Sequence, residues 1–407
     1  MATAAKAASK AWMPLSRQNS SALRREGDER MSLKTKAALL LKQGVEGPYA
    51  QSKPIEIAEI DLAPPGDEEV LVKVTAAALC HTDLSFISGD RPKEMPMVLG
   101  HEACGEVLEV GGRVSDLSAG DQVIFSFMPR CGHCPECIDG RPVLCEEGTK
   151  ANAAGTLLSG HRRMQHKGKN IHHQAGLSAF SEMVVVSRHS LIKVDDPVEP
   201  THAALFGCAV LTGGGAVANS AGVSIGDTVA VVGLGGVGLS SVMMARACGA
   251  REIIGIDVND DKLAQAKELG ATATFNARDE GCVEAVLEHT KGGVQYALEM
   301  AGVPSTMEMA YAITRRGGTT ITASLARNDT IWNLPPVSLV AGERTVKGSY
   351  FGSSVPTRDV PRYLDLFRQG RLPVEKLLSG TLSLDQINEG FDKLAAGAVT
   401  RQVITFD

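Results

Sequence analysis

The sequence predicts an α/β protein that combines an irregular β-rich part with a doubly wound parallel sheet. Residues 34–187 carry short runs of β-branched and other apolar residues between glycine and proline breaks, which is typical of strands and loops. From about residue 211 to residue 324, strand patterns alternate with helical patterns, and this alternation predicts a parallel sheet with helices on both faces. The length of 407 residues fits about two domains.

The composition indicates a globular protein that acts on a small molecule. Hydrophobic residues make up 43% of the chain, enough for a sizeable core, and no apolar run reaches the length of a membrane span without glycines or charges. The formal net charge is −6 and there is no basic stripe, which argues against nucleic acid and membrane partners. We expect a cytoplasmic protein, with residues 1–30 as a disordered extension or, alternatively, a targeting segment.

Two residues from separate segments, Cys80 and His101, suggest a metal centre. A catalytic zinc typically takes three protein ligands and keeps a fourth position open, and two cysteines with one histidine are a known set. Cys208, far downstream, is therefore our candidate for the third ligand. Side chains that could orient a ligand follow the first two, and these are Thr82, Asp83 and Glu102. The alternative is three buried residues without metal, because free cysteine packs as a small hydrophobic group.

Residues 131–145 contain the strongest local signal, a run of four cysteines. Two residues separate Cys131 from Cys134 and Cys134 from Cys137, and Cys145 follows after seven more, so one short lobe can direct four thiolates at a tetrahedral ion. Closed coordination leaves no position for substrate, which predicts a structural zinc. An iron–sulfur site and two disulfides are the alternatives, although an odd total of nine cysteines favours metal ligation in a reducing compartment.

The polar stretch 148–180 carries several histidines, among them the neighbours His172 and His173. Side chains of adjacent residues diverge, so the pair is poorly placed to share one ion. We expect a solvated or interface loop here, with a further metal site as the alternative.

A glycine-rich turn follows the first strand pattern of the second half. Gly233, Gly235 and Gly238 form GxGxxG, in which the glycines allow a tight turn, the approach of a pyrophosphate and close packing of helix on strand. Asp257 ends the next strand pattern about 20 residues later, where a carboxylate accepts ribose hydroxyls and repels a 2′-phosphate. The motif predicts NAD in preference to NADP, and a nucleotide-free Rossmann-like unit is the alternative. The other expected contacts are Leu234, Gly236, Val237 and, at the ribose, Lys262.

The last segment, from about residue 354, has two helical patterns and a closing strand over 401–407. That strand could complete the β-rich part and make it discontinuous. We therefore expect a first domain of residues 31–210 and 354–407 around a nucleotide-binding domain of residues 211–353.

From about residue 34 onward, the chain resembles the zinc-dependent medium-chain alcohol dehydrogenases. The family's motifs occur in its order, namely CHTD at 80–83, GHE at 100–102, the four-cysteine lobe, GCxxxTG at 207–213, GLGGVG at 233–238, the acidic strand end and INEGFDKL at 387–394. The resemblance implies a GroES-like catalytic domain and a Rossmann domain with the active site between them. It implies a catalytic zinc on Cys80, His101 and Cys208, with Glu102 behind it, and a structural zinc on the lobe.

The activity implied by this resemblance is reversible oxidation of an alcohol to an aldehyde or ketone by hydride transfer to NAD. Thr82 would receive the hydroxyl proton, Asp83 would orient His101, and Phe127 would line the substrate pocket. The contacts implied for the pyrophosphate are His81 and Arg401.

Two positions depart from patterns within the family. Many members end their proton relay with a histidine where this chain has Ser85, so we expect the relay to finish through water or another group. The alternative activity is that of an S-(hydroxymethyl)glutathione dehydrogenase, although that class carries an arginine where this chain has Thr149. A second alternative is a non-catalytic zinc-binding protein of the same fold. We expect a homodimer, with a tetramer as the alternative.

Overall fold

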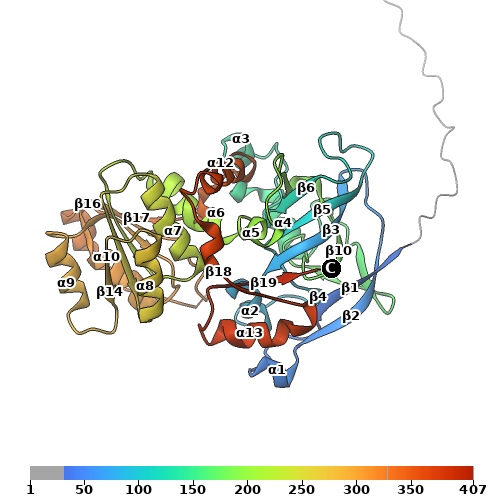
Figure 1. The fold of residues 1–407 in the computed structure, drawn as a ribbon, viewed down its shortest axis with the longest axis horizontal. Helices are drawn as coiled ribbons and strands as arrows, with labels where there is room; N and C mark the ends of the chain where they lie inside the picture. The colour runs from blue at the N-terminus through green and yellow to red at the C-terminus, as the bar shows by residue number, and fades with distance from the viewer. Residues whose placement is uncertain (1–31, 328, 407) are drawn as a thin grey trace, which may run out of the picture. The chain divides into compact units, whose positions relative to one another are not determined.

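The computed structural model describes residues 32–327 and 329–406, so the expectation for residues 1–30 lies outside the described residues. Three sheets, with helices around them, make up the described part of the chain (Figure 1). Two sheets are mainly antiparallel and the third is entirely parallel, which confirms the predicted α/β architecture. None of the helices in the described ranges combines the length and apolar character that a membrane crossing requires.

The first sheet is built on a long antiparallel pair, in which Leu33 lies opposite Leu62 and Leu40 lies opposite Ile55. Along the second strand of the pair, buried and more exposed residues largely alternate, because successive side chains point to opposite faces. The strands in sheet order are β8 (Lys169–Asn170), β7 (Met164–His166), β2 (Ile55–Leu62), β1 (Leu33–Leu40), β4 (Met97–Val98) and β9 (His172–His173).

The second sheet brings the C-terminal strand against the strand that precedes Cys80. Its strands in order are β11 (Leu191–Lys193), β6 (Gln122–Phe125), β5 (Ala103–Val110), β3 (Glu69–Ala78), β19 (Arg401–Thr405) and β18 (Leu378–Leu382), and β10 (Met183–Ser187) also pairs with β3. Val403 of β19 lies opposite Ala78, and Ala77 of β3 pairs with Ala103 of β5. The residues just after β3 and just before β5 are therefore held close together.

The third sheet has the strand order of a doubly wound nucleotide-binding fold. Its parallel strands in order are β14 (Ala273–Asn276), β13 (Glu252–Asp257), β12 (Thr228–Val232), β15 (Val294–Glu299), β16 (Thr314–Thr322) and β17 (Thr345–Gly348). The crossover helices are α7 (Gly236–Ala247), α8 (Asp260–Leu269), α9 (Cys282–His289) and α10 (Pro304–Ala312). The order reverses between β12 and β15, and such a switch point is where open α/β sheets bind ligands.

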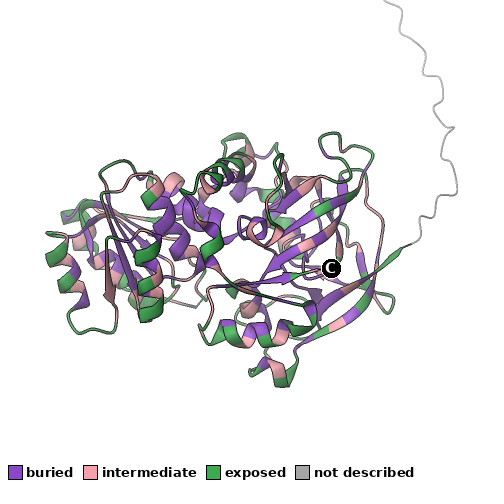
Figure 2. Cartoon of the chain, viewed as in Figure 1, coloured by how far each residue is buried: buried purple, intermediate pink, exposed green. Residues whose placement is uncertain are grey.

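Further helices connect and cover the sheets. They are α1 (Tyr49–Ser52), α2 (His81–Ile87), α3 (Pro135–Ile138), α4 (Glu146–Ala154), α5 (Pro200–Leu205), α6 (Ala209–Gly215), α11 (Pro336–Ala341), α12 (Pro356–Arg368) and α13 (Ile387–Ala395). A π-helical turn spans Ala216–Ala221, and 3₁₀ turns span Pro142–Leu144, Arg188–Ser190, Tyr350–Ser353, Val374–Leu377 and Leu384–Gln386. Figure 2 shows that buried residues gather in the strands and on the helix faces turned toward them. All five residues of β12 are buried, as expected for a central strand covered on both faces.

The expectation of a solvated loop over residues 148–180 is wrong for its second half. Ile171, His173, Leu177 and Phe180 are fully buried, and Gln174 is 2% exposed. The reason is that β9 pairs with β4 and joins the first sheet as its edge strand, and the apolar residues on either side of β9 pack into the core. His173 finds one partner there, because its Nε2 accepts the N–H of Arg163 at 3.2 Å, whereas its Nδ1 has none among the described residues.

Candidate metal and cofactor sites

The structure brings the three candidate ligands Cys80, His101 and Cys208 together with Glu102. One ligand atom from each of these four side chains lies within 4.8 Å of the others, and all four residues are buried. Cys80 precedes α2, His101 and Glu102 precede β5, and Cys208 precedes α6. Two thiols and an imidazole fit an open zinc site.

Asp83 fixes both of the first two ligands. Its Oδ2 accepts the backbone N–H of Cys80 at 3.0 Å, and its Oδ1 lies 2.9 Å from Nδ1 of His101. Nδ1 of His101 donates to this carboxylate, and Nε2 is the ring nitrogen left to bind a metal. A hydrogen bond with Cys208 lowers the pKa of Cys80 well below its usual value, and the charge of His101 acts in the same direction. The cluster therefore favours the thiolate, the form that binds metal, at Cys80, whereas the same hydrogen bond raises the pKa of Cys208 well above its usual value.

Glu102 and Arg401 form an ion pair inside the protein that the sequence did not indicate. The Oε2 of Glu102 lies 3.4 Å from Nη1 of Arg401, and the exposed fractions of the two side chains are 0% and 4%. Burial raises the pKa of Glu102 to about 7, although Arg401 opposes this shift. Glu102 also accepts the N–H of Ala209 at 3.4 Å. The carboxylate thus lies close to the predicted zinc ligands and beside the residue after Cys208.

Arg401 also contacts the glycine-rich turn before α7. A Cβ on Gly236 would lie 2.2 Å from Nε of Arg401, so no larger residue fits there without movement. This Nε is buried and has no hydrogen-bond partner among the residues that the structure describes. An unpartnered guanidinium N–H beside a helix N-terminus fits a bound phosphate. The predicted contact between Arg401 and a pyrophosphate nevertheless stays a prediction.

The three motif glycines differ in their surroundings as a dinucleotide turn requires. Gly233 has a φ of 93°, a left-handed conformation that favours glycine. A Cβ on Gly238 would lie 1.9 Å from the carbonyl oxygen of Gly233, whereas a Cβ on Gly235 would meet no atom within 4 Å. The turn thus has a tight bend, a close packing contact and an open side for a ligand.

Asp257 lies at the end of β13, directly beside this turn. Its Oδ2 accepts the N–H of Leu234 at 2.7 Å and its Oδ1 accepts the N–H of Asn259 at 3.0 Å. Desolvation lowers the pKa of His81, and the positive charges of Arg401 and Lys262 act in the same direction. His81, Lys262 and Arg401 are therefore close enough to affect one another's charge. Val237 is the second residue of α7.

Thr82 and Ser85 lie on α2, which begins directly after Cys80. Both are partly exposed, so solvent reaches this side of the helix. The Ser85 hydroxyl donates to the carbonyl oxygens of His81 at 3.0 Å and Thr82 at 2.9 Å. The hydroxyl hydrogen of Ser85 is thus already used in hydrogen bonds inside the helix.

Phe127 lies next to the metal-ligand cluster, together with two aromatic residues that sequence reasoning missed. Its ring centroid is 5.8 Å from that of His101, 4.0 Å from that of Phe351 and 6.1 Å from that of Tyr350. Tyr350 and Phe351 belong to a 3₁₀ turn more than 200 residues downstream, and no local motif marks them. The rings form an apolar wall beside His101.

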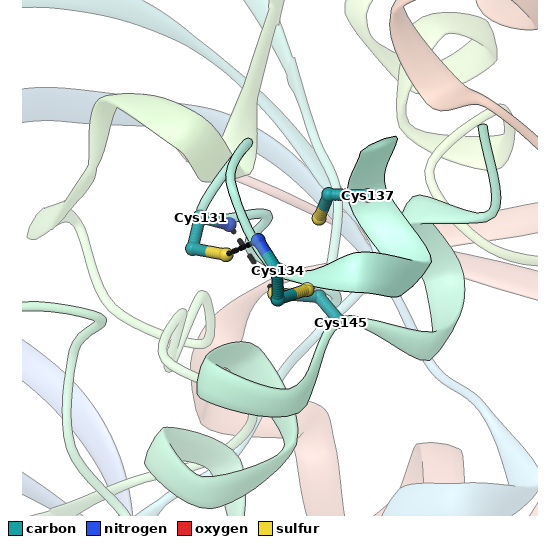
Figure 3. Close-up of side chains that lie close together, drawn as sticks. All are labelled: Cys131, Cys134, Cys137 and Cys145. Carbon is teal, nitrogen blue, oxygen red and sulfur yellow. Dashed lines mark hydrogen bonds between the residues drawn. The ribbon is translucent and has the colours of Figure 1, made fainter. Parts of the chain in front are cut away.

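The four lobe cysteines point toward one another (Figure 3). Their sulfurs lie within 4.8 Å of one another, and none of the four is in a disulfide. Backbone N–H groups donate to the sulfur of Cys145 from Cys131 at 3.2 Å and from Gly148 at 3.4 Å. Backbone hydrogen bonds from Cys137 and Glu146 lower the pKa of Cys134 to about 6. Four converging sulfurs with N–H donors fit a closed zinc site, and the two-disulfide alternative is wrong.

Two family models match separate parts of the chain. The model of the alcohol dehydrogenase GroES-like domain matches residues 66–196, and the model of zinc-binding dehydrogenases matches residues 236–369. The first covers the Cys80 segment and the lobe, and the second covers most of the parallel sheet.

Solved structures agree with these matches. The chain is 33% identical to an alcohol dehydrogenase zinc-binding domain protein from Burkholderia ambifaria (TM-score 0.87) and 30% identical to benzyl alcohol dehydrogenase from Acinetobacter calcoaceticus (TM-score 0.86). It is 28% identical to a putative zinc-binding dehydrogenase from Sinorhizobium meliloti that was solved bound to NADP (TM-score 0.75). Each match covers 92% of this chain and 100% of the other. With both family models matched and this identity over nearly its whole length, the chain belongs to the zinc-dependent medium-chain alcohol dehydrogenases, a family of oxidoreductases.

Proposed function

We propose that this protein oxidises an alcohol to an aldehyde or ketone, reversibly, with NAD as the hydride acceptor. The observation that carries the proposal is the buried cluster of Cys80, His101 and Cys208, oriented by Asp83 and joined through Arg401 to the glycine turn. Zinc held by these three residues supplies a Lewis acid that lowers the pKa of an alcohol hydroxyl, and NAD on the turn supplies the hydride acceptor.

Side chains of the protein orient the metal ligands, transfer the proton and balance charge. Asp83 keeps Nε2 of His101 free to act as a ligand, and the backbone N–H of Cys80 holds Asp83 in place. Thr82, two residues after Cys80, receives the proton of the alcohol and passes it toward the nicotinamide ribose. Glu102 stands behind the zinc ligands, where its carboxylate can replace a departing ligand and Arg401 balances its charge.

We also propose a second, structural zinc in the four-cysteine lobe, and a division of the chain at the boundaries expected from the sequence. The pairing of β19 with β3 supports a discontinuous catalytic domain of residues 31–210 and 354–407. The parallel sheet supports a nucleotide-binding domain of residues 211–353.

We propose that the substrate is an alcohol that carries an aromatic ring. The wall of Phe127, Phe351 and Tyr350 supports it, because aromatic rings pack favourably on one another. The likeness to the Acinetobacter benzyl alcohol dehydrogenase supports the same choice. No contact in the described part of the chain favours a glutathione adduct.

The decisive experiment counts zinc and measures NADH formation on one preparation, with benzyl, primary and secondary alcohols. We expect two zinc ions per chain and turnover that is highest with benzyl alcohol. Turnover only after addition of glutathione and formaldehyde would instead support the S-(hydroxymethyl)glutathione dehydrogenase. One zinc ion and no turnover on any substrate would support the non-catalytic alternative.

Replacement of Asp257 with serine should shift the cofactor preference toward NADP. The carboxylate repels a 2′-phosphate at close range, and an interaction of about 3 kcal/mol predicts a change of about 100-fold in the ratio of kcat/KM for NAD to that for NADP. Steady-state kinetics with both cofactors measure this ratio. Asp261→Ser, which removes an equally negative but exposed side chain from α8, is the control and should leave the ratio unchanged. Equal ratios in all three proteins would contradict the role of Asp257.

The variant Ser85→His should change the pH profile of alcohol oxidation. Because the wild-type hydroxyl does not titrate near neutral pH and already donates to helix carbonyls, its kcat/KM profile should show no ionisation from this site. In Ser85→His, kcat/KM should rise with pH through about 6.5, since only the neutral imidazole accepts a proton. Ser88→His, at the end of the same helix, is the control. If the pH profiles of kcat/KM for wild type and Ser85→His were superimposable, the proton relay would not pass through this position.

We propose a homodimer formed through one edge of the parallel sheet. β17 is an edge strand, and α11 buries none of its residues within the chain. Large apolar side chains are exposed on α11, namely Val337 and Val340, and between β16 and α11, namely Leu325 and Ile331. A second copy of the chain would cover this surface.

A further inference from the structure

Gln174 lies in the segment that the sequence indicated to be solvated, yet it is buried between two parts of the metal-ligand cluster. Its Nε2 donates to Oδ1 of Asp83 at 2.6 Å, and its Oε1 accepts the N–H of Gly100. Asp83 belongs to the helix that follows Cys80, and Gly100 directly precedes His101. The amide therefore bridges the two segments that carry the first two candidate ligands.

Backbone hydrogen bonds hold the segment that carries this amide in place. β9 pairs with β4, and the backbone N–H of Gln174 donates to the Ser178 hydroxyl at 3.0 Å. The Ser178 hydroxyl in turn donates to the carbonyl oxygen of Val98 at 2.8 Å. Both ends of the side-chain amide have the partner that their chemistry requires, a carboxylate for the NH₂ and an N–H for the oxygen.

The carboxylate of Asp83 depends on this bridge. It is fully buried and accepts hydrogen bonds from Cys80, His101 and Gln174. A buried charged group that loses a donor is costly, so without Gln174 the carboxylate would shift toward another partner. Its bond to His101 would then no longer hold the imidazole at the cluster.

We propose that Gln174 is a positioning residue that sets how firmly the cluster of Cys80, His101 and Cys208 retains zinc. This inference rests on the proposed function of that cluster. Outer partners of metal ligands typically change metal affinity by about 10- to 100-fold, and Gln174 acts on a ligand through Asp83 and on the backbone through Gly100.

The test compares zinc release to a coloured chelator from wild type, Gln174→Met and Gln174→Glu. Methionine keeps the length of the side chain without its donors, and glutamate keeps an acceptor for Gly100 but places a second carboxylate against Asp83. In both variants we expect one zinc to leave about 10- to 100-fold faster, with release from the lobe unchanged as an internal standard. We also expect altered absorption bands after cobalt replaces the catalytic zinc. Gln165→Met, at an exposed glutamine of β7, should behave as wild type.

The outcomes separate this inference from the proposed function. A wild-type protein that holds only the lobe zinc would refute the proposed function and this inference with it. A wild-type protein with two zinc ions, and Gln174 variants with unchanged release and cobalt spectra, would refute the role of Gln174 alone. If Gln174→Met does not fold, Gln174→Glu decides by the same two measurements.

Discussion

Replacing Cys208 with alanine is expected to lower the zinc content from two ions per chain to one and the turnover number by about 10³-fold. The expected size follows from the Lewis-acid contribution of a metal, which is several kcal/mol, and each 1.4 kcal/mol corresponds to about a factor of ten in rate. Without Cys208, only Cys80 and His101 of the three proposed ligands remain, and the ion pair with Arg401 competes with zinc for the carboxylate of Glu102. Zinc analysis and steady-state NADH formation measure both effects.

Cys282→Ala is the matched control for this prediction. Cys282 is a buried cysteine of α9, remote from both cysteine clusters in sequence and absent from either candidate site. This variant should keep two zinc ions and wild-type turnover. If Cys208→Ala kept both its zinc and its rate, the assignment of the open site to Cys80, His101 and Cys208 would be wrong.

Cys145→Ser is expected to lower the free energy of unfolding much more than the rate of turnover. Cys145 is fully buried and its sulfur accepts the N–H groups of Cys131 and Gly148, so it lies at the centre of the lobe. Loss of a metal is one of the few single changes that cost about 4 kcal/mol or more of unfolding free energy. The lobe has little apolar core that could replace the ion, since α3 has no buried residue.

Urea unfolding monitored by circular dichroism, together with zinc analysis, checks this second prediction. The variant should lose one zinc ion and unfold at a lower urea concentration, while the remaining zinc still supports turnover at low temperature. Cys248→Ser, a half-buried cysteine at the end of α7, should change neither zinc content nor the unfolding midpoint substantially. An unchanged midpoint in Cys145→Ser would mean that the lobe stabilises itself without metal.

Features contained in one short segment were predictable from the sequence. The lobe is an example, because its four cysteines lie within one short loop and their spacing alone directs the sulfurs inward. The turn of Gly233, Gly235 and Gly238 is another, because its conformation and packing follow from the absence of Cβ atoms at those positions. The alternation of strands and helices likewise predicted the parallel sheet.

The error over residues 148–180 shows where such reasoning fails. Polar residues and histidines usually indicate exposure, but β9 carries this segment into the interior, where His173 and Gln174 have hydrogen-bond partners. Burial of a polar side chain depends on partners from other segments, and local composition does not contain them.

The sequence by itself determined the residue types of both metal clusters, the dinucleotide turn and the class of fold. Only the tertiary structure decided the ion pair of Glu102 with Arg401, the bridge from Gln174 to Asp83 and the aromatic wall around Phe127. These contacts join segments that are far apart in the chain, up to about 300 residues for Glu102 and Arg401. The ion pair follows from the pairing of β19 with β3 and of β3 with β5, and the Gln174 bridge follows from the pairing of β9 with β4. The aromatic wall joins the segment after β6 to the 3₁₀ turn after β17. Strand pairing is a cooperative property of the whole sheet, so no single segment encodes it.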